Sequence, residues 1–182
     1  MNRRLKERIY NETLRQYIDW YGAEHGANGS CLYWSLTAGL VLQRHGIRSI
    51  LQAGTMLWPM AEDTGTNETH FGYQWDPTDI GSQAALEVGA MPEIHIWIVL
   101  PETQEIIDFS VRHLPRLAAL DGKTWTKETP PDFLWVKKEQ MPDGVIYRAE
   151  VGATLWLIRK LAQDGYVKSN ELSDHKLIKT YG

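Results

Sequence analysis

Cysteine is almost absent from this sequence, because Cys31 is the single one among 182 residues. One cysteine cannot form an internal disulfide, so we expect no oxidised framework and no dependence on an oxidising compartment. Long apolar runs are also missing: the longest span about seven residues, whereas a membrane helix needs roughly 20. The N-terminus has no apolar signal core either. These absences predict a cytoplasmic protein without a membrane partner.

Excess positive charge is absent as well. The 19 lysine and arginine residues are outnumbered by 23 acidic ones, which gives a formal net charge of -4 and no broad basic surface for phosphates. The sequence has no HExxH or CxxC pattern, no GxxxxGK[ST] or strand-associated GxGxxG loop, and no GxSxG elbow. We therefore expect no nucleic-acid partner, no metal, no bound cofactor and no serine nucleophile of that type.

What the sequence does contain is typical of one folded domain. Apolar residues make up 43% and charged residues 23%, and eight tryptophans indicate large buried rings or an aromatic-lined cleft. The length suits one domain over 1–182, and no repeat or interdomain linker divides it.

The hydrophobic pattern predicts a mixture of helices and strands. Predicted helices cover 2–21, ending near Gly22, then 31–45, ended by Gly46, a short one at 112–120 and a last one at 154–165. Predicted strands cover 47–58, 71–75, 93–100, 105–111, 132–136 and 144–150. Loops are expected at 22–30, 61–70 and 76–92, and the polar tail to residue 182 has only a weak pattern.

The segment 93–111 is the clearest hairpin, with PETQ as its turn. If the connection is an even-length loop centred on Glu102 and Thr103, paired positions sum to 205. His95 and Asp108 then share one face of the sheet as diagonal neighbours, roughly 7 Å apart at the backbone and within reach of a hydrogen bond. An odd loop would separate them.

Cys31 falls in the first turn of the second predicted helix, after Asn28 or Ser30 as a capping residue. Free backbone amides and the positive end of the helix dipole favour a thiolate there. The same amides can stabilise the oxyanion that forms when sulfur attacks a carbonyl. A histidine held by a carboxylate could serve as the proton shuttle.

The runs GSCLYWSLTAGLVLQRHGIRSILQAGTM and HIWIVLPETQEIID resemble the core of transglutaminase-like proteins in the papain-like cysteine protease superfamily. The resemblance covers about 55 of the residues between 29 and 111. It implies an α+β fold in which the cysteine helix packs on an antiparallel β-sheet. It carries the nucleophile onto Cys31, the base onto His95 and the orienting carboxylate onto Asp108.

Two departures from that pattern leave alternatives open. The D-P-T that often ends the family's strand occurs here at residues 76–78, so Asp76 is a rival to Asp108. Gln16, Trp20 and Asn28 are candidates for the side-chain oxyanion donor that is usual in this superfamily. Asn28 is also assigned with Trp34 and Trp97 to substrate binding, and Trp97 shares the predicted face of His95.

The leading hypothesis is a cysteine-dependent enzyme that acts on an amide or acyl group of a peptide or protein substrate. The acyl group could pass to water or to an amine. A second hypothesis is a non-catalytic domain of the same fold that binds a peptide or protein partner, since a lone cysteine in an apolar helix is usually inert. A third is an effector or toxin that modifies proteins by the same chemistry.

Overall fold

The computed structural model describes residues 1–22, 30–61, 69–76, 78–88, 90 and 92–165. Its helices are α1 (Arg3–Tyr21), α2 (Ser30–Arg44), α3 (Ile80–Glu87), α4 (Leu114–Leu120) and α5 (Val151–Gln163), with 3-10 turns η1 (Val111–His113) and η2 (Lys138–Gln140). Its strands are β1 (Ile50–Pro59), β2 (His70–Tyr73), β3 (His95–Leu100), β4 (Glu105–Asp108), β5 (Leu134–Lys137) and β6 (Ile146–Ala149). The described residues thus form a mixed helix and strand fold, compatible with the α+β class.

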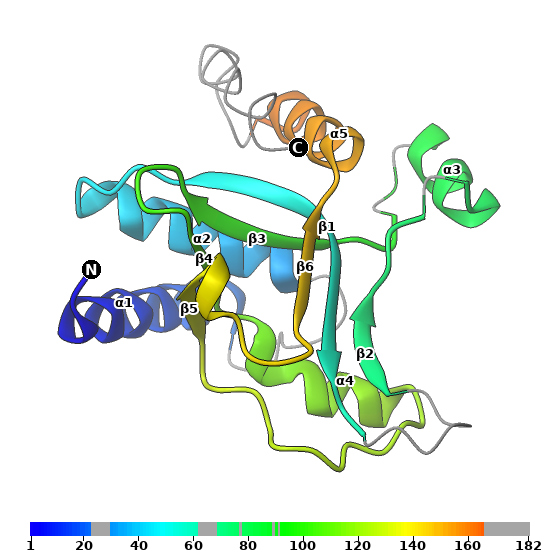
Figure 1. Ribbon diagram of the computed structural model, residues 1–182. Coiled ribbons are helices and arrows are strands. Elements are labelled where there is room, and N and C mark those ends of the chain that lie inside the picture. Colours follow the sequence, from blue (N-terminus) through cyan, green and yellow to red (C-terminus); the bar gives the residue numbers. More distant parts are fainter. Residues whose placement is uncertain (23–29, 62–68, 77, 89, 91, 166–182) are drawn as a thin grey trace.

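The strands form one curled sheet in which every pairing is antiparallel (Figure 1). The main order is β2-β1-β3-β4-β5, and β6 pairs with β1 off this path. The long strand β1 makes this possible, because its first half pairs with β3 and its second half pairs with β2 and β6. The β1–β6 pairing places residues 146–149 beside residues 54–57, which lie about 90 positions earlier in the sequence.

Different helices cover the two faces of the sheet. Alternate residues of β3, β4 and β5 pack against α1 and α2 in one buried cluster, which includes Ile98, Leu100, Ile107 and Trp135. The intervening residues pack against η1 and α4 in a second cluster, which includes Trp97, Val99, Ile106 and Leu134. A third cluster joins the start of α2 to β1, β3 and α5 through Cys31, Ala53, Ile96 and Leu157. The start of α2 therefore lies at the sheet, against the first residues of β3.

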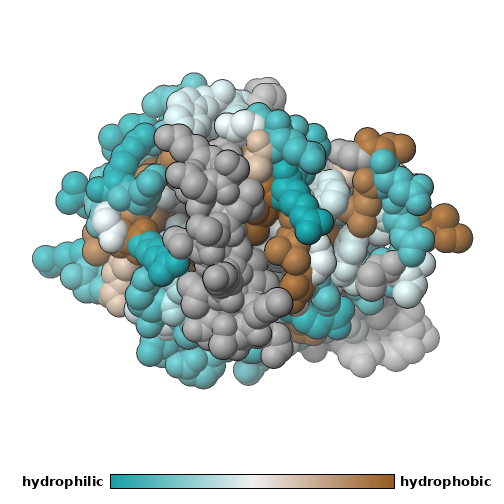
Figure 2. Space-filling view, turned by 90° about the horizontal axis from the view of Figure 1, so that it is seen from above, coloured by the Kyte–Doolittle hydropathy of each residue, from teal (hydrophilic) through white to brown (hydrophobic). Residues whose placement is uncertain are grey.

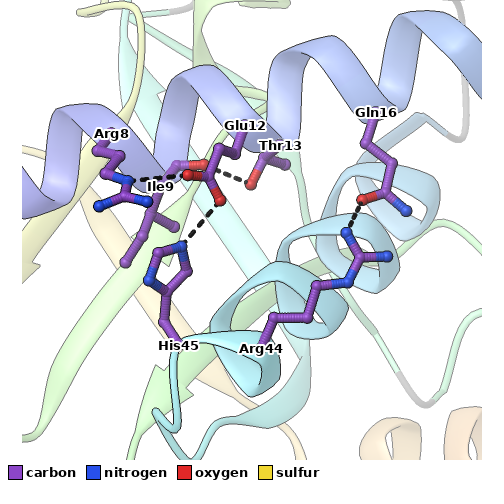
Figure 3. A network of polar contacts seen from close by, with 7 residues as sticks. All are labelled: Arg8, Ile9, Glu12, Thr13, Gln16, Arg44 and His45. Atoms are coloured by element: carbon purple, nitrogen blue, oxygen red, sulfur yellow. Dashed lines mark hydrogen bonds and ion pairs between the residues drawn. The ribbon is translucent and has the colours of Figure 1, made fainter.

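A polar network ties α1 to the end of α2 (Figure 3). Glu12 accepts one hydrogen bond from Arg8 at 2.9 Å and contacts Nε2 of His45 at 2.8 Å, while Arg44 donates to Gln16 at 2.7 Å. The apolar faces of α1 and α2 also pack together, and the ring of Tyr17 stacks on Trp34 with a centroid distance of 3.8 Å. These contacts hold α2 against α1.

Most predicted elements are confirmed, including the end of α1 at Gly22 and the turn at Gly46, both with positive φ. The predicted loop over 76–92 is wrong, because α3 occupies Ile80–Glu87. Asp79 caps α3 by accepting a 2.7 Å hydrogen bond from the Ser82 amide. The predicted connector 22–30 and polar loop 61–70 lie mostly outside the described residues, and so does the tail after 165.

The surface near α3 carries exposed apolar side chains: Ile80 is 81% and Val88 is 79% accessible. Brown residues gather at the corresponding edge of Figure 2, on the side where Figure 1 places α3.

Within the part of the chain that the structure describes, no helix combines the length and apolar character needed to cross a membrane.

Candidate functional site

Cys31 is the second residue of α2, and its side chain is buried, with 6% of its surface accessible. One turn later Ser35 donates a 3.1 Å hydrogen bond to the backbone oxygen of Ile96, the residue that follows His95. This bond anchors the first turns of α2 against the start of β3. The helix N-terminus, whose first amides have no partner within the helix, is thereby held next to the histidine strand.

His95 and Asp108 contact each other directly. Nε2 of His95 lies 2.5 Å from Oδ2 of Asp108, and both side chains are almost fully buried. The hairpin register explains the contact: Ile98 pairs with Ile107 and Leu100 with Glu105, so paired positions sum to 205 as the turn sequence predicts. The predicted diagonal neighbours therefore meet as a hydrogen-bonded pair.

The carboxylate of Asp108 is fully occupied by donors. Oδ1 accepts hydrogen bonds from the amide and the hydroxyl of Ser110, at 2.8 and 2.7 Å. Oδ2 accepts from Tyr147 at 2.7 Å in addition to its contact with His95. Four partners on one buried carboxylate fix its orientation and offset much of its desolvation.

Aromatic rings enclose the imidazole of His95. The Tyr73 ring stacks with it at a centroid distance of 5.4 Å, and Trp97 lies nearly parallel at 6.2 Å. Tyr147 meets it edge-on, also at 6.2 Å. Electron-rich ring faces favour a positively charged imidazolium, and the rings also exclude water from the pair.

The electrostatics of the pair favour its charged form. Burial opposes charge on His95, but the charges of Asp108 and Cys31, with hydrogen bonding to both, raise the pKa of His95 from 6.5 to about 10. Burial likewise opposes charge on Asp108, yet the His95 charge and hydrogen bonds from His95, Ser110 and Tyr147 lower the pKa of this carboxyl. Both shifts favour an imidazolium paired with a carboxylate.

The other ring nitrogen of His95 is open to Cys31. Since Nε2 is taken by Asp108, Nδ1 is the nitrogen left for the sulfur, which lies near enough for its charge to raise the His95 pKa. Among the described residues Nδ1 has no hydrogen-bond partner of standard geometry. The thiol, imidazole and carboxylate are thus gathered in the order that nucleophile, proton shuttle and orienting group require.

The remaining predicted residues have more varied positions. Trp34 is 2% and Trp97 is 1% accessible, so in this conformation both are packing residues, and substrate contact by either stays a prediction. Asn28 lies outside the described residues. Among the candidate oxyanion donors, Gln16 is engaged by Arg44 and Trp20 is 51% exposed on α1.

Asp76 is not the partner of His95. It is exposed and accepts hydrogen bonds from the amide and hydroxyl of Thr78, at 2.8 and 2.7 Å, which lower its pKa. Asp76 is therefore engaged by Thr78 just before α3, and the carboxylate that pairs with His95 is that of Asp108.

Sequence reasoning missed three residues around the pair, namely Tyr73, Ser110 and Tyr147. Ser110 could have been found, because a serine two residues after an aspartate often hydrogen-bonds that carboxylate. Tyr73 and Tyr147 carry no such local signal. Their positions depend on β2 and β6 pairing with the second half of β1.

The described residues contain no group of three histidine, cysteine or acidic side chains arranged to hold a metal ion. Taken with the fold, the site defines a mixed helix and strand protein in which a buried thiol lies beside a hydrogen-bonded histidine–aspartate pair. Comparisons with protein-family models, curated proteins and solved structures found no match to this chain.

Proposed function

We propose that this protein is a cysteine-dependent enzyme of transglutaminase-like type that acts on amide or acyl groups of a peptide or protein substrate. The observation that carries the proposal is the His95–Asp108 hydrogen bond, made through Nε2 so that Nδ1 is left for Cys31. A structural histidine needs no thiol at its second nitrogen. A proton shuttle for a cysteine nucleophile does.

The proposed reaction passes through an acyl-enzyme. The Cys31 sulfur attacks the carbonyl carbon, and free amides at the start of α2 stabilise the resulting oxyanion. The bond to the leaving amine breaks as His95 gives that nitrogen its proton. Water or a second amine, deprotonated by His95, then attacks the thioester and releases the thiol. Asp108 keeps the imidazole oriented throughout.

The first test is the rate of Cys31 alkylation by iodoacetamide as a function of pH, read by intact mass. We expect alkylation to persist well below pH 8, where ordinary thiols with a pKa of about 8.5 react slowly, and to change in a His95→Gln variant. His45→Gln is the matched control, because His45 also bonds a carboxylate but lies at the far end of α2. A rate that follows an ordinary thiol and ignores His95 would reject the proposal.

A second test looks for the covalent intermediate. After brief exposure to p-nitrophenyl acetate, the intact protein should carry one acetyl group, which peptide mapping assigns to Cys31. The Cys31→Ala variant should carry none. An equal adduct in both proteins would mean that another nucleophile reacts and that the acyl-enzyme step is wrong.

The alternative is a non-catalytic domain of the same type that binds a peptide or protein partner. Burial of Cys31, His95 and Asp108 favours it, since each is at most 6% accessible. An open groove of about 720 Å³ between α1 and the β5 segment is lined by Lys6 and Trp135 and by none of the three site residues. Absence of both alkylation and acetylation in the folded protein would favour this alternative.

A further inference from the structure

The Asp108 carboxylate shares one oxygen between two donors from different strands. Oδ2 meets Nε2 of His95 from β3 and the hydroxyl of Tyr147 from β6, at 2.5 and 2.7 Å. Tyr147 also packs edge-on against the rings of His95 and Trp97, at 6.2 and 5.2 Å. The Tyr147 ring therefore packs against the strand that carries His95 while its hydroxyl lies on the carboxylate.

The hydroxyl of Tyr147 acts on the proton that the pair shares. A donor on a carboxylate stabilises the ionised form and lowers the affinity of that oxygen for a further proton. Tyr147 itself stays protonated, because burial and the Asp108 charge raise its pKa well above the ordinary 10. It can donate to Asp108 but cannot supply charge.

We propose that Tyr147 is a positioning residue: its hydroxyl keeps the Asp108 carboxylate ionised and fixed, so that the shared proton remains on His95. For its catalytic meaning this inference rests on the proposed function. The effect on the His95–Asp108 pair itself does not depend on turnover. It can be measured in the resting protein.

Other titratable groups also face the pair, and each could add to its pH dependence. They are Cys31 from α2, Tyr73 from β2 and His113 from η1, with the charges of Arg112 and Arg116 beside His113. His113 is neutral near pH 7, because burial and these two arginines lower its pKa to about 4. Tyr147 differs from these groups in donating directly to the carboxylate.

The test compares Tyr147→Phe with Tyr10→Phe. Tyr10 is a buried tyrosine whose hydroxyl accepts a 2.6 Å bond from Arg112, in the cluster on the other face of the sheet. Each variant thus loses one partly buried hydrogen bond of a tyrosine hydroxyl and keeps the aromatic ring. The readouts are the pH titration of the His95 ring resonances, assigned with His95→Gln, and the pH profile of Cys31 alkylation.

In Tyr147→Phe the carboxylate loses a donor and binds a proton more tightly. We therefore expect the transition at the acid end of both pH profiles to shift to higher pH by about one unit, which is a tenfold rise in the proton affinity of the pair. Tyr10→Phe should leave both profiles as in the wild type. Replacing Tyr147 with 3-fluorotyrosine, a stronger donor of nearly the same size, should move the transition the opposite way, which covers the case in which Tyr147→Phe folds poorly.

Unchanged His95 titration in both Tyr147 variants would overturn the inference and make Tyr147 a packing residue. If instead the proposed enzymatic function is wrong, the alkylation experiment gives a different result from the one that overturns this inference. In that case wild-type alkylation ignores His95→Gln, while the His95 resonances still report whether Tyr147 acts on the pair.

Discussion

At the scale of single residues, the charges of His95 and Asp108 depend on each other and on the nearby Cys31. Cys31 and Asp108 both raise the pKa of His95 against the effect of burial, and His95 in turn keeps Asp108 ionised. Removing one member of a buried charged pair is costly, because the partner is left uncompensated. Substitutions in the site should therefore change both reactivity and stability, in proportions that differ from residue to residue.

Asp108→Asn should separate the orienting charge from the shape of the side chain. We expect the Cys31 alkylation rate near pH 6 to fall at least about tenfold and the unfolding free energy to fall by about 3 kcal/mol, since a buried charge loses its partner. Asp76→Asn is the matched control and should change both by little, because Asp76 is exposed and its carboxylate accepts hydrogen bonds from the nearby Thr78. Equal effects of the two variants would remove Asp108 from its proposed role.

Cys31→Ala should leave the fold intact, because one small buried side chain replaces another. We expect the unfolding free energy in urea to change by about 1 kcal/mol or less. The pKa of His95 should decrease, because the charge of the sulfur raises it in the wild type. An unchanged His95 titration by NMR would mean that the sulfur and the ring do not interact.

At the scale of elements, the site depends on how closely β6 approaches β1. Gly54 is where β1 meets both neighbours, since it pairs with His95 of β3 and with Ala149 of β6. A Cβ built there would lie 2.3 Å from the backbone oxygen of Arg148. Backbone atoms cannot give way as a flexible side chain can, so only glycine allows this approach.

Gly54→Ala should push β6 away from β1 and loosen the Tyr147 contact with Asp108. We expect a loss of about 3 kcal/mol in unfolding free energy, at the upper end for overpacking, and a shift of the His95 titration toward that of Tyr147→Phe. Gly152→Ala, in the first turn of α5 with open space at its Cβ, should instead stabilise by about 0.5 kcal/mol. Similar melting temperatures for both variants would contradict the steric argument.

Sequence alone predicted the parts of the site that depend on local pattern. The PETQ turn sets the β3–β4 register, and that register alone brings His95 to Asp108. The helix start at Ser30 puts Cys31 in the first turn. Tyr147 could not be predicted, because its position comes from strands far apart in the chain, and α3 was missed because its short apolar pattern resembles a loop.

At the scale of the whole molecule, two histidines whose pKa values are shifted in opposite directions set the pH range of stability. His95 has a folded pKa above the unfolded value of 6.5, so its contribution is complete below about pH 6.5 and is lost as pH rises toward 10. His113 has its pKa lowered to about 4 by burial and two arginines, so the unfolded chain takes up that proton first as pH falls. Asp108, with a lowered pKa, adds stability that disappears only at more acid pH.

Unfolding free energy should therefore be highest near pH 6.5 and decline on both sides. Between about pH 6.5 and 4, neutral His113 should account for about 1–2 kcal/mol of the loss, a value reduced from its full pKa shift because the side chain is partly accessible. Urea unfolding across about pH 4 to 9 measures this curve.

His113→Gln should flatten the acid side of the curve and leave the alkaline side unchanged, whereas His95→Gln should flatten the alkaline side. If stability still falls toward acid pH in His113→Gln, the loss must come from carboxylates such as Asp108, because this variant has no imidazole at position 113.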